Sequence, residues 1–197
     1  PLDKINAGNV GKLQLAWAYA TGQGDGHQAP PIVNNGYMFV TTPGAQVIAF
    51  DAKTGEQLWR YKKELPADLV QVHPTNRGVA LYGDKVYVAT VDAHLIALDA
   101  KTGRILWEGQ AHPPVSFSPD GEEFAMHPAG IVYYDARTGL PNGKLPMHVG
   151  AESLVYSRDG SRLAAVVQPG NKWGAEPGIF IYERGVYHYS PDLPPLT

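Results

Sequence analysis

The stretch that decides the fold is FDAKTGEQLW, residues 50–59, which returns almost unchanged as LDAKTGRILW at residues 98–107. The two copies lie forty-eight residues apart, counted from Asp51 to Asp99. A third copy begins as YDARTG at Tyr134 and continues without a tryptophan. Self-similarity at a period of about 20 to 50 residues is typical of repeat architectures. The sequence therefore predicts repeated supersecondary units.

Each long copy closes a run of short apolar segments. The second unit reads GVALYG, KVYVATV, HLIALD and RILWEG, and the alternation within KVYVATV is typical of a strand with two unlike faces. In the DAKTG turn, Asp and Thr can bond nearby amides while Gly accepts a positive φ, and the following Trp would pack on the neighbouring sheet. We expect these structural roles for Asp51, Thr54, Gly55, Trp59, Asp99, Thr102, Gly103 and Trp107.

A second pair of repeats joins its strands through Asp-Gly hairpins. VSFSPDGEEFAMHP and LVYSRDGSRLAAVV align on turns thirty-nine residues apart. Without the Trp, these units need other apolar groups, for which we expect Tyr133, Tyr134, Phe180 and Tyr182. The chain then contains four units, near residues 29–61, 78–109, 113–149 and 151–190, with one strand left over at 13–22.

This pattern predicts an all-β fold, a β-propeller with four four-stranded blades per chain plus an extra N-terminal strand. A β-sandwich or irregular barrel would also contain many short strands, but it gives no reason for the matched turn and Trp spacing. Four blades can close within one chain or form half of an eight-bladed ring completed by a second copy. Only one short helical turn, beginning near Asp3, is expected.

Composition excludes several classes of function. A net charge of −3 and a pI near 6.2 argue against nucleic acid or an anionic membrane as partner. No apolar run reaches the roughly 18 to 20 residues of a membrane span. The absence of cysteine excludes disulfides, thiolate-bound zinc and thiol catalysis. The start at Pro1, without an initiator Met or a signal peptide, indicates a processed or cut chain.

The spacing Ala-x-Asp-x-x-Thr-Gly-x-x-x-Trp resembles the tryptophan-docking repeat of quinoprotein alcohol dehydrogenases. PLDKINAGNVGKLQLAWAYATG resembles the start of their mature chains, and GHQAPPIV and the HPTNRG segment resemble their first two blades. The resemblance covers residues 1–110. It implies an eight-bladed propeller with pyrroloquinoline quinone (PQQ) and a calcium or lanthanide ion on its axis, in the periplasm or secreted.

After Gln110 the hairpins FSPDG and YSRDG resemble those of WD40-like or lactonase-like propellers. We therefore expect two parts, residues 1–110 and 111–197, within one continuous propeller domain. This change, with the Pro1 start and the shortened repeat, favours an engineered or recombined chain over uneven natural divergence.

The resemblance implies cofactor contacts at two residues. Arg77 matches the arginine that reaches the quinone in the family, although a structural or solvent-exposed role is equally open. Gln28 stands where the family often has Glu, and an amide can bond a quinone oxygen without supplying charge. The family's metal ligands, catalytic Asp and floor Trp have no match, so we assign no catalytic or metal residues.

The other groups of candidate residues are better explained by structural roles. The acids Asp120, Glu122, Glu123, Glu152 and Asp159 are calcium ligands by type, but the Asp-Gly pairs are explained by hairpins. His112, His127 and His148 lack the spacing of a zinc site. The irregular segment 168–178 exposes Trp173 as a candidate contact loop, unless that ring covers the core.

The sequence predicts a non-catalytic propeller scaffold or binding module, a fragment or hybrid of a PQQ-dependent dehydrogenase propeller. The alternative is a PQQ- and calcium-dependent alcohol dehydrogenase whose ring is completed by homodimerisation, with a small molecule on its axis.

Overall fold

A computed structural model describes residues 4–24, 26–71, 73, 75–127, 130–145, 151–168 and 177–186. The predicted contact residue Trp173 and His148 lie outside this described part. Within it, the only labelled helix is the 3-10 turn η2 (Val10–Lys12), and no described helix is long and apolar enough to cross a membrane.

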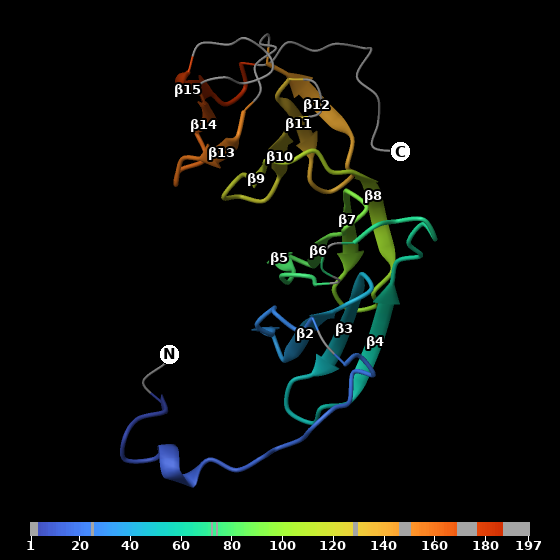
Figure 1. The fold of residues 1–197 in the computed structure, drawn as a ribbon. Helices are drawn as coiled ribbons and strands as arrows, with labels where there is room; N and C mark the ends of the chain where they lie inside the picture. Colours follow the sequence, from blue (N-terminus) through green and yellow to red (C-terminus); the bar gives the residue numbers. More distant parts are fainter. Residues whose placement is uncertain are drawn as a thin grey trace. The chain divides into compact units, whose positions relative to one another are not determined.

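The strands form four antiparallel sheets, each hydrogen-bonded in chain order (Figure 1). Sheet 1 contains β1 (Ile32–Asn34), β2 (Tyr37–Thr42), β3 (Gln46–Asp51) and β4 (Gln57–Lys62). Sheet 2 contains β5 (Ala80–Tyr82), β6 (Lys85–Ala89), β7 (His94–Asp99) and β8 (Ile105–Gln110). Sheet 3 contains β9 (Val115–Phe117), β10 (Glu123–Met126), β11 (Val132–Asp135) and β12 (Pro141–Lys144). Sheet 4 contains β13 (Ser153–Tyr156), β14 (Arg162–Val167) and β15 (Gly178–Glu183).

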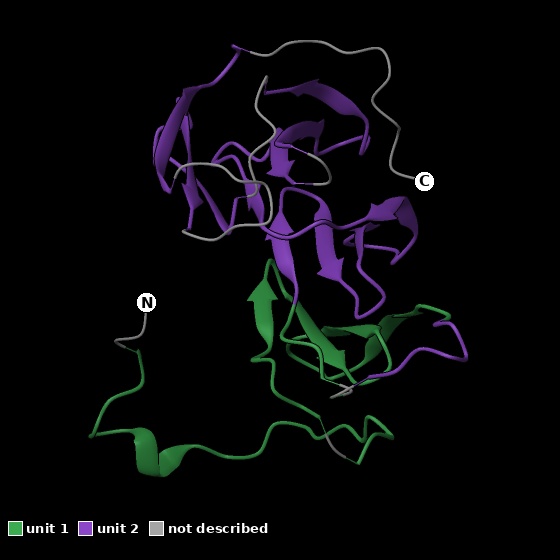
Figure 2. Ribbon diagram, turned by 45° about the horizontal axis from the view of Figure 1, so that its top comes forward, with its two compact units in different colours: residues 1–64, 72–78 green, residues 65–71, 79–197 purple. Residues whose placement is uncertain are grey.

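The all-β prediction is confirmed, and the sheets are propeller blades with the predicted strand order. The chain divides into two compact units (Figure 2). Unit 1 comprises residues 1–64 and 72–78 and holds sheet 1, while unit 2 comprises residues 65–71 and 79–197 and holds sheets 2 to 4. The outer strand expected for sheet 4 near 186–190 falls almost wholly outside the described residues.

The DAKTG turns form as predicted. The Asp51 carboxylate accepts the amides of Lys53 and Thr54 at 2.9 and 2.8 Å, and Gly55 has a φ of +77°. The Asp99 carboxylate accepts both the amide and the hydroxyl of Thr102 at 2.8 Å. These bonds stabilise the carboxylate form, so the pKa of Asp51 and that of Asp99 lie below the usual value.

The tryptophan of sheet 2 docks on the turn of sheet 3. Trp107 is 7% exposed, and its Nε1 donates a 2.9 Å hydrogen bond to the carbonyl of Ala136. Gly139, with a φ of +71°, lies under the ring, because a Cβ there would sit 2.9 Å from the Cδ2 of Trp107. The predicted packing of Trp107 on the neighbouring sheet is confirmed. Trp59 is equally buried and contacts Phe39 in its own sheet, and its docking on the following sheet stays a prediction.

The N-terminal segment differs from the prediction. Residues 13–21 form no strand in the structure, because they form no backbone ladder with a described strand, although the Tyr19 hydroxyl donates to Gln57 and accepts from Arg60 of β4. Trp17 nevertheless docks on sheet 1 as Trp107 docks on sheet 3. Its Nε1 donates to the carbonyl of Ala52 at 3.2 Å, and a Cβ on Gly55 would lie 2.5 Å from its Cδ2.

Sheet 3 compensates for its missing tryptophan across one strand pair. In sheet 2, Ala97 pairs with Trp107, whereas in sheet 3 Tyr133 pairs with Gly143. The large ring has thus moved from the outer strand to its neighbour. Tyr133 is 1% exposed and packs in a core with residues of sheet 4, where Phe180 and Tyr182 also pack. Tyr134 stacks on Phe124 in the core that contains Trp107.

Ion pairs replace the indole at the contact between sheets 3 and 4. Arg184, at the turn position that Ala136 holds in sheet 3, reaches back to the hairpin of sheet 3. Its guanidinium pairs with Asp120 and, through Nε at 3.0 Å, with the buried carboxylate of Glu123. Glu123 also accepts the hydroxyl of Tyr156 at 2.8 Å. The hydrogen bond from Arg184 lowers the pKa of Asp120 to about 2.

Candidate functional site

The two predicted cofactor residues are brought together by the segments that precede β1 and β5. His27 and Asn76 form an isolated parallel β-bridge within unit 1. Gln28 and Arg77 each follow one bridged residue, so they occupy neighbouring positions on two paired backbones, which in a β ladder lie about 4.8 Å apart. Forty-nine positions apart in the sequence, these two residues are neighbours in the fold.

Local contacts hold the bridge in place. His27 Nε2 lies 3.0 Å from the Thr21 hydroxyl and 3.3 Å from the Gln23 carbonyl. The side-chain oxygen of Asn76 accepts the amide of Gly78 at 2.9 Å. His27 is therefore an exposed bridge residue whose ring contacts link it to the preceding backbone.

A glycine permits the close approach of this segment to the sheet. Gly26 has a φ of +76°, and a Cβ there would lie 2.7 Å from Pro43 and 3.5 Å from the methyl group of Thr75. Pro43 belongs to the turn between β2 and β3, and its carbonyl accepts the side-chain amide of the buried Gln46 at 3.1 Å. The bridge thus rests on a well-packed turn of sheet 1.

Gln28 and Arg77 are both exposed. Their side chains offer one amide, able to donate and accept, and one permanent cation with several donors. PQQ is a planar tricarboxylate with carbonyl oxygens, and a guanidinium next to an amide fits one polar edge of such a molecule. These residues fit part of the quinone contact that the family resemblance implies.

The described residues contain no group of three His, Cys, Asp or Glu side chains placed to hold a metal ion. Two of the acids considered for calcium are bound to other side chains. Asp120 accepts the hydroxyl of Ser118 and pairs with Arg184, and Asp159 accepts the hydroxyls of Ser157 and Ser161. The hydrogen bond from Ser157 lowers the pKa of Asp159 to about 2. The described part of the chain therefore does not fit the calcium ion, and no chemistry is assigned to one.

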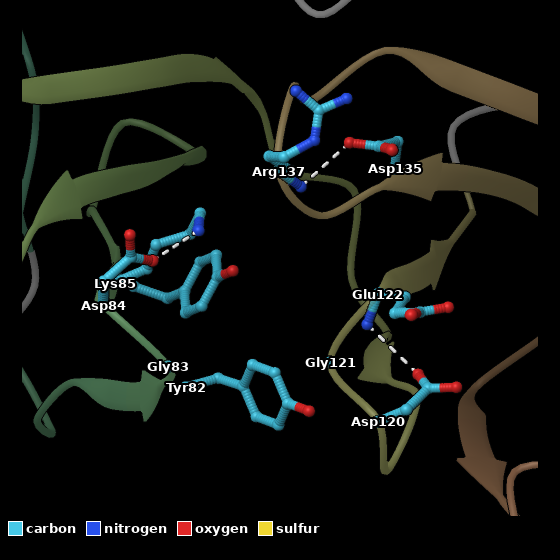
Figure 3. Close-up of a pocket in the computed structure, with 10 residues that line it drawn as sticks. Tyr82, Gly83, Asp84, Lys85, Asp120, Gly121, Glu122, Asp135 and Arg137 are labelled. Carbon is cyan, nitrogen blue, oxygen red and sulfur yellow. Dashed lines mark hydrogen bonds and ion pairs between the residues drawn. The ribbon is translucent and has the colours of Figure 1, made fainter.

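Unit 2 contains a cavity of about 520 Å³ at the strand ends of sheets 2 and 3 (Figure 3). Its lining comes from three turns and the strands they join, and includes neither Gln28 nor Arg77: Tyr82, Gly83, Asp84, Lys85, Tyr87, Asp120, Gly121, Glu122, Asp135 and Arg137. Burial raises the pKa of Tyr87 to about 12, and its hydroxyl donates to the Ala136 carbonyl at 3.3 Å.

Charged groups that line this cavity already form contacts within the turns. Lys85 pairs with Asp84 at 2.6 Å, and one carboxylate oxygen of Asp135 accepts the amide of Arg137. The ring of Tyr82 covers Gly121, where a Cβ would lie 2.1 Å from it. We therefore interpret the cavity as a gap between packed turns, and place the candidate site at Gln28 and Arg77.

Comparison with known proteins connects this arrangement to a family. The model of the PQQ glucose/ethanol/alcohol dehydrogenase β-propeller domain matches residues 1–161. The chain belongs to this family. This PQQ-type propeller chain is 36% identical over 165 residues to the quinoprotein ethanol dehydrogenase of Pseudomonas aeruginosa. That alignment covers 81% of this chain and 26% of that protein, so the chain spans about a quarter of this relative.

Solved structures agree with the fold of this PQQ-type propeller chain. The quinohemoprotein alcohol dehydrogenase of Comamonas testosteroni matches 83% of the chain at 25% identity with a TM-score of 0.60, over 32% of its own length. BamB of Moraxella catarrhalis matches 82% of the chain at 16% identity with a TM-score of 0.55, over 48% of its own length, and shows the fold alone.

The predicted change of family after Gln110 is wrong, because one family model continues to residue 161. These findings give no support for a hybrid or engineered chain. The structure explains why the sequence misled: sheet 3 keeps the turn acceptor Ala136 for Trp107 but replaces its own tryptophan through Tyr133 and Gly143.

Two features of the site were missed from the sequence. The sequence gives no signal that Trp17 docks on sheet 1, because no DAKTG turn precedes this residue. The bridge between His27 and Asn76 joins two irregular segments, and pairing of single residues leaves no periodic pattern.

Proposed function

We propose that this chain is the quinone-contacting blade module of a PQQ-dependent alcohol dehydrogenase propeller, and that it is a scaffold without catalytic activity when alone. The observation that carries the proposal is the bridge between His27 and Asn76, which sets Gln28 and Arg77 side by side in solvent. Membership in the family and the polar chemistry of this pair support PQQ as the ligand. Membership in the family also supports a location in the periplasm or outside the cell.

In this role Arg77 binds a carboxylate of the quinone and Gln28 bonds an oxygen at its edge. When bound, PQQ supplies the electron-accepting carbonyl chemistry of alcohol oxidation. The chain contributes orientation, because both residues are carried by backbones fixed to each other. The proposal assigns no base and no metal ligand to this chain.

The experiment combines binding with activity. PQQ affinity is measured by equilibrium dialysis for the natural chain, for Arg77→Ala and for Arg104→Ala, an exposed arginine in the turn of sheet 2. We expect Arg77→Ala to weaken binding roughly tenfold or more, since a charged hydrogen bond contributes about 1.5 to 3 kcal/mol. The Arg104 variant should bind normally. Equal binding by all three would refute the quinone contact.

Dye-linked alcohol oxidation with PQQ and calcium tests the scaffold assignment. We expect no turnover above that of the cofactor alone. Turnover that disappears in Arg77→Ala would instead favour a dehydrogenase completed by a second copy of the chain.

A further inference from the structure

The turn between β1 and β2 holds an Asn-Gly pair in an open position. Asn34 pairs with Tyr37, so Asn35 and Gly36 alone form the turn. Their φ angles are +49° and +83°, as in the type I′ turn that favours this pair of residues. Both residues are exposed, and a Cβ on Gly36 would meet nothing within 4 Å. Water therefore reaches both of them.

The reactive groups at the centre of this turn are unused. The Gly36 carbonyl accepts the amide of Ala52 at 2.8 Å, which holds one end of the turn. Within the described part of the chain, neither the side chain of Asn35 nor the amide of Gly36 takes part in a hydrogen bond. The side chain of Asn35 can therefore turn toward the peptide nitrogen that follows it.

These two groups can react with each other. The Gly36 nitrogen, once a base has removed its proton, attacks the side-chain carbonyl carbon of Asn35. A bond forms between this nitrogen and this carbon, the bond from the carbon to the amide nitrogen breaks, and the amide takes up a proton and leaves as ammonia. Water opens the resulting cyclic imide at either carbonyl and gives aspartate or isoaspartate, so one water is consumed and one ammonia released without an oxidant or cofactor. The attack is intramolecular, and glycine has no Cβ to crowd it.

The chain contains a second Asn-Gly pair, which the fold protects. Asn142 and Gly143 lie in β12, where Gly143 is buried and pairs with Tyr133 of β11. By contrast, β1 is a strand of three residues, and its Val33 is 57% exposed. The attack requires the backbone to rotate, which opens only a short turn at Gly36 but would take Gly143 out of its ladder. The same dipeptide thus stands in one open and one protected position.

We propose that Asn35 and Gly36 form a self-modification site, at which the folded chain reacts with water and converts Asn35 to aspartate and isoaspartate. The proposal does not rest on the quinone contact. Its basis is the pair of exposed groups that no hydrogen bond holds, in a turn that needs only local opening for them to meet. Water is the reacting partner, and the new carboxylate adds one negative charge to a chain whose net charge is −3.

The modification has a structural consequence within unit 1. Isoaspartate continues the backbone through its side-chain carbon, which lengthens a turn whose geometry fits two ordinary residues. The isoaspartyl form should therefore lose either the pair of Asn34 with Tyr37 or the bond from the Ala52 amide to the Gly36 carbonyl. The Ala52 carbonyl accepts the indole of Trp17 at 3.2 Å, so this change reaches the place where the N-terminal segment docks. We expect faster hydrogen exchange at the Ala52 amide in the isoaspartyl form.

The test ages the natural chain in mildly alkaline buffer and follows both sites by tryptic digestion and mass spectrometry. Trypsin places Asn35 in the peptide 13–53 and Asn142 in the peptide 138–144, so the two sites are measured separately, and fragmentation assigns the modified residue. We expect Asn35 to react roughly tenfold faster or more, the factor that a difference of about 1.4 kcal/mol in local opening produces. In concentrated urea the two rates should converge. Asn35→Gly keeps a pair that suits the turn, and should abolish the reaction in the first peptide only.

Three results would overturn the proposal. The first is a folded chain in which Asn142 reacts as fast as Asn35 or faster. The second is an Asn35 that stays unmodified for the time in which both sites react in urea. The third is a rate at Asn35 that does not rise with pH, since the Gly36 nitrogen must lose its proton before it attacks. Unchanged exchange of the Ala52 amide in the purified isoaspartyl form would refute the structural consequence.

Discussion

Replacing Trp107 by alanine tests the contact that joins sheets 2 and 3. The indole is 7% exposed, stacks on Phe124 with ring centroids 5.4 Å apart, and donates to the Ala136 carbonyl. A tryptophan buries about 150 to 250 Å² of surface, and large-to-small substitutions of buried aromatics cost about 3 to 5 kcal/mol. We expect a loss of unfolding free energy in that range for Trp107→Ala.

The assay is urea unfolding followed by far-UV circular dichroism. With a denaturant slope of about 2 kcal/mol per molar, the expected loss moves the midpoint by roughly 2 M. Trp107→Phe separates the hydrogen bond from the packing, and should cost about 1 to 2 kcal/mol because the Ala136 carbonyl loses the shorter of its two hydrogen bonds and keeps that from Tyr87. Leu106→Ala is the control, since Leu106 is 45% exposed and should cost less than about 1 kcal/mol. A cost below about 1 kcal/mol for Trp107→Ala would refute the docking assignment.

Three further predictions concern the same contacts. Gly139→Ala should destabilise the protein by about 1 to 3 kcal/mol, because its φ is +71° and the new Cβ would meet the Trp107 ring; an unchanged melting temperature would contradict this. Arg184→Ala should lower the free energy of unfolding by about 2 to 3 kcal/mol, because it leaves the Glu123 carboxylate buried without its cation. Hydrogen exchange in β13 to β15 should rise in this variant and rise less in Arg184→Lys. Equal exchange in the natural chain and both variants would contradict the ion-pair assignment. The pKa of Asp120 falls from 3.8 to about 2 on folding, so its stabilising effect is complete above pH 4 and is lost as pH falls toward 2. Arg184→Ala should remove the loss of stability between pH 4 and pH 2 that Asp120 causes, measured by urea midpoints in that range. An unaltered pH profile would assign this loss to other carboxylates.

Local repeats were readable from the sequence because their chemistry is contained within a few residues. Asp51 and Thr54 bond amides next to them, so the turn can be predicted wherever the motif stands. The alternating residues of β6 likewise predicted a strand, although its middle residues are buried on both faces and the two unlike faces expected from the alternation are not found. The blade units and the docking of Trp107 followed from these two signals.

Compensation between strands was only partly readable, because Tyr133 was expected to replace the missing tryptophan but its partner on the next strand was not. The exchange of the pair Ala97 and Trp107 for the pair Tyr133 and Gly143 is visible only once the register of β11 and β12 is known, since the two members of each pair lie on different strands. The predicted change of family after Gln110 followed from this, because the lost tryptophan was taken as a sign of another family. The replacement of an indole by Arg184 has the same origin, because its partners come from another sheet.

The candidate site was partly predictable. Gln28 and Arg77 came from a family resemblance, residue by residue, and the sequence could not show that they are neighbours. Their juxtaposition depends on one isolated bridge, held by Thr21 and Asn76 side chains in segments without periodicity.

The most direct test of the account is a titration of the isotope-labelled chain with PQQ, followed by nitrogen-proton correlation spectra. The account predicts that the side-chain signals of Gln28 and Arg77 shift together and saturate together, while Arg104 stays unchanged. Shifts that instead centre on Tyr82 and Lys85 would move the ligand to the cavity of unit 2. The absence of any shift at Gln28 and Arg77 would contradict the quinone-contact assignment.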